Sequence, residues 1–179
     1  SEQLIHRIGM PPALFDAYER EHPRGSVTQR LLAILNPNKL DVLRDLLRDT
    51  ESHKKVFVYC DKVAALAGLA DVVADAAPSR VFCGIFCGNT STADRTSFLE
   101  RVRDHSPCVG LLSRAGNSSI DVPDLDTVIE VDVDDASVQK FVQRIGRPQR
   151  FHATKARATI HTLVSDGTHE VRFVAHRTD

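Results

Sequence analysis

The feature that most constrains the fold is an alternation of short apolar runs with longer segments of helical periodicity. Residues 56–60 read VFVYC, and the segment before them places Leu40, Leu43, Leu46 and Leu47 at helical spacing. Apolar runs of about four to eight residues between helices of about ten to fifteen are typical of right-handed βαβ crossovers. Such crossovers build a mostly parallel sheet that is covered on both faces. We therefore predict a three-layer, doubly wound α/β domain.

The same order recurs along the rest of the chain. Further strands are expected at residues 80–87, 108–112, 127–133 and 158–164. Further helices are expected at residues 61–76, 92–105, 136–145 and 170–176. About five strands result. Because parallel strands end at one edge of a sheet, the loops after residues 60, 87, 112 and 133 should share one functional edge.

The N-terminal segment has a different character, because prolines and Gly25 interrupt its short apolar stretches. We predict that residues 1–35 form an arm from a preceding domain or linker, with one helix at residues 13–20. The domain itself is expected at residues 36–179, since a chain of 179 residues falls near the usual size of one domain.

Composition excludes several classes of protein. A content of 42% hydrophobic and 26% charged residues argues against long disorder. The net charge of -1 means that any nucleic-acid contact must come from local clusters of Arg and Lys. No apolar run is long enough to span a bilayer, and no signal peptide is evident. The four cysteines lie in apolar runs, which favours a reducing, intracellular compartment, and Cys83 and Cys87 lack the second ligand pair that a zinc site needs.

The strongest local motif is QRIGRPQR at residues 143–150, where arginines recur every three residues across a helix end. Arg144 and Arg147 lie on neighbouring positions of one side while the chain is helical, and Arg150 follows from the turn. Guanidinium forks suit the spread negative charge of a phosphoryl group leaving ATP. The alternative is that these arginines pair with carboxylates such as Asp134 and solvate the helix end.

A second motif is the polar loop SRAGNSSIDVP at residues 113–123, directly after a predicted strand. Asp121 could accept a hydrogen bond from a sugar hydroxyl or an arginine. The alternative is an ordinary crossover loop in which Gly116 allows a positive φ and Pro123 rigidifies the exit.

Taken in this order, the segments resemble the C-terminal motor lobe of superfamily-two helicases. The last motif of that lobe reads Q-R-x-G-R-x-x-R and follows a Gly-containing loop that ends in Asp. The resemblance is sharper to the XPB helicase family of the transcription and repair factor TFIIH. The segments that carry this sharper resemblance are residues 36–39 (NPNK), 88–91 (GNTS) with Arg95, 113–123 and 163–168 (LVSDGT). It covers almost the whole chain from about Met10.

The resemblance implies a RecA-like fold of the P-loop NTPase type. It also implies an ATP-dependent DNA helicase or translocase of 3′-to-5′ polarity that acts in promoter opening and nucleotide-excision repair. No G-x-x-x-x-G-K-[ST] loop occurs in the sequence. ATP with Mg²⁺ is therefore expected only in the full-length protein, and this chain alone is expected to be inactive. Expected partners are DNA, the protein's own N-terminal helicase lobe and subunits of a TFIIH-like complex, with no membrane. The expected location is the nucleus, or the cytoplasm for a prokaryotic source.

The motif match also implies roles for single residues. Those expected at the nucleotide are Gly116, Asp121, Gln143, Arg144, Arg147 and Arg150. Arg147 and Arg150 are the expected arginine fingers. Those expected to track the phosphates of one DNA strand are Asp61, Lys62, Gly88, Asn89, Thr90, Arg95, Ser113 and Arg114. No metal-binding residues are expected.

Two other functions fit the same motifs. A RecA-like domain can be retained as a non-catalytic protein-interaction module, with the arginines as contacts to an acidic surface. The lobe of an RNA helicase would keep the same arginine motif. Comparing affinities for single-stranded DNA and RNA would distinguish an RNA helicase from a DNA helicase.

Overall fold

The chain folds around one sheet whose strands all run in the same direction. The computed structural model describes residues 2–49, 55–76, 80–114, 120–136, 138, 140, 142 and 158–178. The strands are β1 (Glu2–Ile8), β2 (Lys55–Tyr59), β3 (Val81–Phe86), β4 (Cys108–Leu112), β5 (Thr127–Glu130) and β6 (Thr159–Ser165). They lie in the order β1-β6-β5-β2-β4-β3, and each neighbouring pair is parallel. The predicted doubly wound α/β fold is confirmed.

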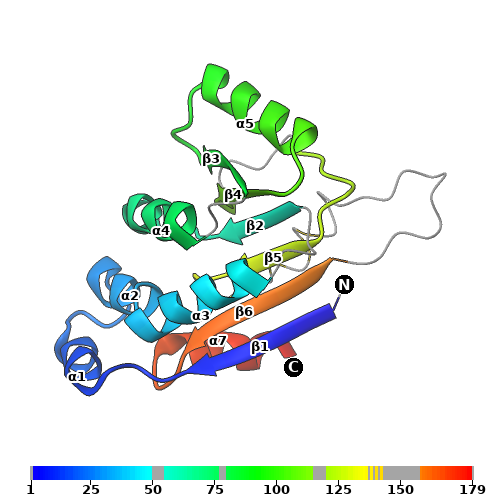
Figure 1. The fold of residues 1–179 in the computed structure, drawn as a ribbon. Coiled ribbons are helices and arrows are strands. Elements are labelled where there is room, and N and C mark those ends of the chain that lie inside the picture. The colour runs from blue at the N-terminus through cyan, green and yellow to red at the C-terminus, as the bar shows by residue number, and fades with distance from the viewer. Residues whose placement is uncertain are drawn as a thin grey trace.

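Helices cover both faces of this sheet (Figure 1). They are α1 (Pro12–Arg20), α2 (Val27–Ile34), α3 (Pro37–Asp49), α4 (Val63–Ala76), α5 (Thr92–Asp104) and α7 (His169–Thr178). Helices α2, α3 and α4 pack on one face, whereas α5 and α7 lie on the other. No helix in the described part of the chain is long and apolar enough to cross a membrane.

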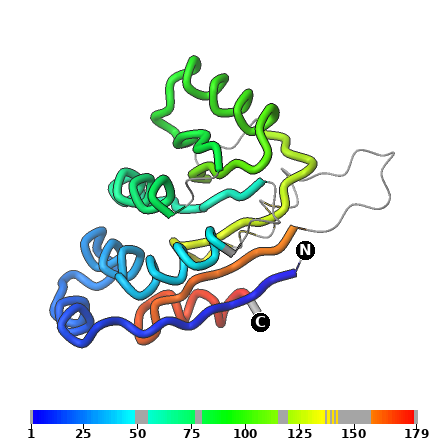
Figure 2. The backbone as a smooth tube through the Cα atoms, viewed as in Figure 1, coloured from blue at the N-terminus to red at the C-terminus, as the bar shows by residue number. Residues whose placement is uncertain are grey.

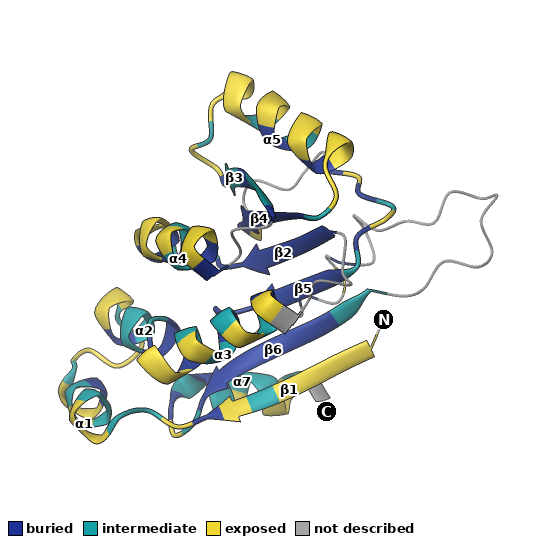
Figure 3. Ribbon diagram, in the orientation of Figure 1, coloured by how far each residue is buried: buried dark blue, intermediate teal, exposed yellow. Residues whose placement is uncertain are grey.

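Alternation along the strands supplies a hydrophobic core to each face. In β2, Val56 and Val58 join the core under α3 and α4, whereas Phe57 and Tyr59 join the core under α5. Figure 3 shows the central strands as buried, in contrast to β1. In β4, a Cβ on Gly110 would lie 2.7 Å from the Phe98 ring, so this glycine allows α5 to approach the sheet closely.

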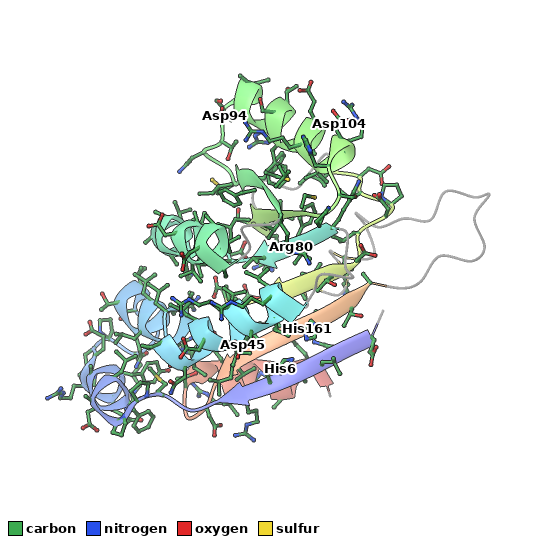
Figure 4. All side chains as sticks on the ribbon, in the orientation of Figure 1. His6, Asp45, Arg80, Asp94, Asp104 and His161 are labelled. Atoms are coloured by element: carbon green, nitrogen blue, oxygen red, sulfur yellow. The ribbon has the colours of Figure 1, made fainter. Side chains whose placement is uncertain are left out.

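The N-terminal segment contributes a strand that the sequence pattern did not predict. β1 pairs with β6 along its whole length, which makes six described strands rather than about five. Its sequence, EQLIHRI, is largely exposed and lacks a continuous apolar run. His6 lies beside His161 of β6, with Nε2 and Nδ1 3.0 Å apart (Figure 4). The predicted helix at residues 13–20 is present as α1, and Figure 2 follows the chain from there through α2 into α3.

A buried ion pair joins the two faces where β5 and β6 end. Lys39 of α3 donates to Oε1 of Glu170 at 2.7 Å, and both side chains are fully buried. Glu170 also accepts hydrogen bonds from the backbone N–H of Ser165 and of Val133. Lys39 further donates to the Val131 carbonyl at 3.0 Å. The pair therefore satisfies backbone groups that would otherwise be unpaired after the strands end.

Candidate functional site

The loops predicted to contact DNA follow three adjacent strands at the same edge of the sheet. Residues 61–62 follow β2, residues 88–90 follow β3, and residues 113–114 follow β4. The strand order places β2, β4 and β3 side by side. Because these strands are parallel, the three loops converge at the carboxyl ends of the strands, which we call the carboxyl edge.

Asp61 and Arg114 connect two of these loops directly. Asp61 Oδ1 accepts a hydrogen bond from the Arg114 backbone N–H at 2.7 Å, and Oδ2 accepts one from the Arg114 guanidinium at 2.6 Å. Tyr59 also donates to Oδ2, at 3.0 Å. Burial, and then the nearby Asp61 carboxylate, raises the pKa of Tyr59 well above its usual value. Tyr59 is therefore a neutral donor at physiological pH.

Arg114 is held from a second direction by Asp134. Its guanidinium lies 2.5 Å from Asp134 Oδ2, and Asp134 Oδ1 lies 3.5 Å from Arg177 of α7. Arg177 in turn donates to both oxygens of Glu130, at 2.8 and 3.0 Å. Burial raises the pKa of Glu130, and Arg177 opposes that shift. The loop after β4 is thus tied into a charged network that extends to α7.

Asp132 fixes the position of the loop after β2. Its Oδ2 accepts hydrogen bonds from the backbone N–H of Asp61 at 3.0 Å and of Lys62 at 3.1 Å. Burial is the main cause that raises the pKa of Asp132, and the charge of Lys62 acts against it. Within the described residues, the Lys62 ammonium has no carboxylate within salt-bridge distance. A cation in a fixed loop is therefore available at the carboxyl edge.

Arg95 holds the turn after β3 together. Its Nε donates to the Thr90 carbonyl at 3.0 Å, and one NH₂ group donates to the carbonyls of Cys87 and Gly88 at 3.1 and 3.3 Å. The guanidinium lies over the Phe86 ring, 5.1 Å from its centroid. These contacts make Arg95 a residue that shapes the turn, and they leave Gly88 and Asn89 exposed.

The residues predicted at the nucleotide are separated from this edge or lie outside the described chain. Gly116, Gln143, Arg144, Arg147 and Arg150 fall outside the described residues. Asp121 is described and is exposed. It lines a cavity of about 530 Å³ with Lys55, which begins β2, and Arg103 near the end of α5. The structure therefore does not bring Asp121 together with Asp61 at the carboxyl edge.

Several residues of the edge network could not be singled out from the sequence. Those that the structure adds are Lys39, Glu130, Asp132, Arg177 and Glu170. One available signal was the pair of acidic residues inside the apolar run TVIEVDV, because a carboxylate in a buried strand needs a partner. Among the described residues, no group of three or more His, Cys, Asp or Glu side chains is arranged to hold a metal ion.

Comparison with known proteins connects this geometry to one family. The family described as ERCC3/RAD25/XPB C-terminal helicase matches residues 8–179. The chain is 29% identical over 155 residues to the DNA repair helicase/translocase XPB-R of Trypanosoma brucei brucei, covering 83% of this chain and 19% of that protein. It is 31% identical over 155 residues to the general transcription and DNA repair factor IIH helicase/translocase subunit XPB of Dictyostelium discoideum, covering 83% of this chain and 18% of that protein.

A solved structure supports the fold independently. The SWI2/SNF2 ATPase core domain of Sulfolobus solfataricus superposes with a TM-score of 0.70 at 13% identity, covering 97% of this chain and 41% of that one. This likeness bears on the fold, which is that of a RecA-like helicase lobe. The chain spans about a fifth of the length of the two XPB relatives. It belongs to the ERCC3/RAD25/XPB C-terminal helicase family.

Proposed function

We propose that the chain is the C-terminal motor lobe of an ATP-dependent DNA helicase or translocase with 3′-to-5′ polarity. In this proposal ATP and Mg²⁺ are bound by the N-terminal lobe of the full-length protein, and this chain completes the site. The proposed partners are DNA, that lobe and subunits of a TFIIH-like complex in promoter opening and nucleotide-excision repair. The proposed location is the nucleus, or the cytoplasm in a prokaryotic source.

The observation that carries the proposal is the convergence of three loops at the carboxyl edge. Lys62 supplies a cation without a carboxylate partner among the described residues, and Gly88 and Asn89 leave an exposed turn. Backbone amides and isolated cations suit a phosphodiester chain, because they bind phosphates without reading bases. Affinity for DNA should therefore be independent of sequence and should fall steeply with salt.

The contributions of Asp61, Arg95 and Arg114 differ from that of Lys62. We propose that they position the DNA-facing loops, because their charged groups are engaged within the chain. Arg114 keeps 42% of its side-chain surface exposed, so it can both hold the loop and face a phosphate. Ser113 donates its backbone N–H to the Phe86 carbonyl at 3.0 Å, which aligns the loops after β4 and β3.

Arg147 and Arg150 are the proposed arginine fingers, positioned by Gln143 and Arg144. Such an arginine neutralises the charge that develops on the γ-phosphate and contributes about 10³ to 10⁵ in rate. In the same proposal, Gly116 couples the nucleotide to DNA, and no such role is proposed for Asp121, which lines the cavity beside Lys55 and Arg103.

The test is ATP turnover of the full-length protein with single-stranded DNA. Arg147→Ala and Arg150→Ala should each lower kcat by about two decades or more, with ATP binding largely retained. Arg103→Ala is the matched control, because Arg103 is an exposed arginine whose ion-pair partner is its neighbour Asp104. Unchanged turnover in folded finger variants would reject the motor role and favour a protein-interaction module.

A further inference from the structure

A second cationic feature lies away from the three DNA-facing loops. Two adjoining cavities, of about 640 and 160 Å³, share the lining residues Tyr18, Arg24, His169 and Arg172. Arg7 lines the larger cavity and Arg30 the smaller one. We call this pair of cavities the arginine cavity. Its lining residues come from β1, the turn after β6, helices α1 and α2 and the start of α7, and Figure 1 shows where these elements lie in the fold.

The positive charge of the arginine cavity is only partly compensated. Arg7 donates to Asp166 at 3.1 Å, and Arg24 lies 3.8 Å from Glu19. Within the described chain, Arg30 and Arg172 have no carboxylate partner, and the buried Nε of Arg30 has no hydrogen-bond partner. The Arg30 Nε is too deeply buried to be reached by a ligand, but Arg30 itself lines the smaller cavity, and within the described chain no carboxylate balances its charge or that of Arg172.

The nearby carboxylate of Glu170 forms an ion pair with Lys39 and none with Arg30 or Arg172. Both of its oxygens are already engaged, by Lys39 and by the backbone N–H groups of Ser165 and Val133. Burial lowers the pKa of His169, the Glu170 carboxylate opposes that shift, and the positive charges of Arg30, Lys39 and Arg172 add to it. Arg30, His169 and Arg172 all line the smaller cavity.

The cavity is held in shape by internal contacts. The Tyr18 hydroxyl accepts a hydrogen bond from the His169 backbone N–H at 2.8 Å, and it lies 2.7 Å from His169 Nδ1. Gln29 donates to the Tyr18 carbonyl at 3.1 Å and accepts from the Gly25 N–H at 2.6 Å. The arginines therefore project from a fixed frame, which reduces the entropy lost when a ligand binds.

We propose that the arginine cavity binds a phosphate group. Its guanidiniums come from α2, α7 and the turn between α1 and α2, so they can surround a tetrahedral anion that accepts several hydrogen bonds. The amino end of α7 adds partial positive charge at the same place. Because the cavity lies at the carboxyl edge, the expected source of the phosphate is a nucleic-acid backbone. This choice of source, unlike phosphate binding itself, rests on the proposed function.

The test compares the full-length protein with an Arg30→Gln/Arg172→Gln double variant and an Arg103→Gln control. In the first arm, the thermal midpoint is measured in potassium phosphate and in potassium chloride of equal ionic strength. Phosphate should raise Tm in the wild type and in the control, because it binds the folded state, and the rise should be smaller in the double variant, which keeps the ATP site and the general stabilisation by phosphate. If Arg30→Gln fails to fold, Arg172→Gln alone serves, because Arg172 is exposed.

The second arm measures affinity for fluorescent oligothymidine over a salt series. Each lost contact should reduce the salt slope by about 0.7 and the affinity roughly fivefold at 0.1 M salt. A reduced slope identifies the DNA backbone as the source, whereas an unchanged slope with a reduced phosphate effect identifies a free phosphorylated compound.

The proposal is overturned if phosphate raises Tm of the double variant as much as that of the wild type. Failure of the proposed function would look different. The wild type and the Arg103→Gln control would then bind no oligothymidine at any salt concentration, while the phosphate arm would still test the cavity.

Discussion

Two groups of arginines lie at the carboxyl edge of the sheet, and they differ in how their charges are used. Arg114 and Arg177 are engaged by carboxylates from the ends of neighbouring strands. Arg30 and Arg172 have no carboxylate partner among the described residues. An engaged guanidinium mainly fixes the position of backbone segments, whereas an unengaged one in a cavity can bind an anion from outside. Residue type alone does not distinguish the two cases.

The largest effect is expected from breaking the most deeply engaged pair. Lys39→Met should leave the buried Glu170 carboxylate without its cation and destabilise the protein by about 3–5 kcal/mol. Urea-induced unfolding measures this loss. Arg44→Ala is the control, because its pair with Asp41 is exposed and should contribute less than about 1 kcal/mol. Equal losses in both variants would contradict the structural role assigned to the Lys39 pair.

A smaller effect is expected from the partly exposed network around Arg114. Arg114→Ala should lower the free energy of unfolding by about 1 kcal/mol, because solvent screens the charges of Asp61 and Asp134 that remain. It should also weaken DNA binding by releasing the loop after β4. Arg114→Lys keeps the charge but not the fork, so it should restore stability only in part. Full restoration by lysine would mean that charge alone matters there.

The smallest effect concerns His169 in the arginine cavity. Its folded-state pKa lies below the usual 6.5, so the unfolded state binds protons more readily as pH falls. The stabilising contribution of neutral His169 is therefore present above about pH 6.5 and is lost as pH falls through the folded-state pKa. Between pH 7 and pH 5, thermal unfolding of His169→Gln should depend less on pH than that of the wild type. An identical pH dependence would show that His169 does not titrate differently in the folded state.

The central sheet could be predicted because its strands are buried on both faces. Apolar runs such as those of β2 and β4 can be recognised in the sequence, and their alternation with helical segments indicates the doubly wound fold class. β1 could not be found in this way, since an exposed edge strand needs no continuous apolar run. The strand expected at residues 127–133 ends at Glu130, beyond which Glu170 captures the Val133 N–H.

The candidate site was less predictable than the fold. The loops that contain Lys62, Asn89 and Arg114 could be predicted, because each loop directly follows a strand that its apolar sequence reveals. Pairing between Asp61 and Arg114, or between Lys39 and Glu170, depends on which elements become neighbours in the fold. No local sequence pattern predicts the strand order of the sheet. The helix expected at residues 136–145 and the arginine motif after it lie mostly outside the described residues, so the finger roles stay predictions.

A carboxyl edge that faces DNA should be detectable by site-specific crosslinking. All four cysteines of this chain are buried, so once accessible cysteines elsewhere in the full-length protein are replaced, an added surface cysteine can carry a photoreactive probe selectively. Asn89→Cys places the probe on the exposed turn after β3, and Asp104→Cys places it at the end of α5, toward the opposite edge of the sheet. With single-stranded DNA bound, the probe at position 89 should crosslink strongly and the probe at position 104 should not. Equal crosslinking at both positions, or crosslinking only at position 104, would show that the carboxyl edge is not the DNA-facing surface.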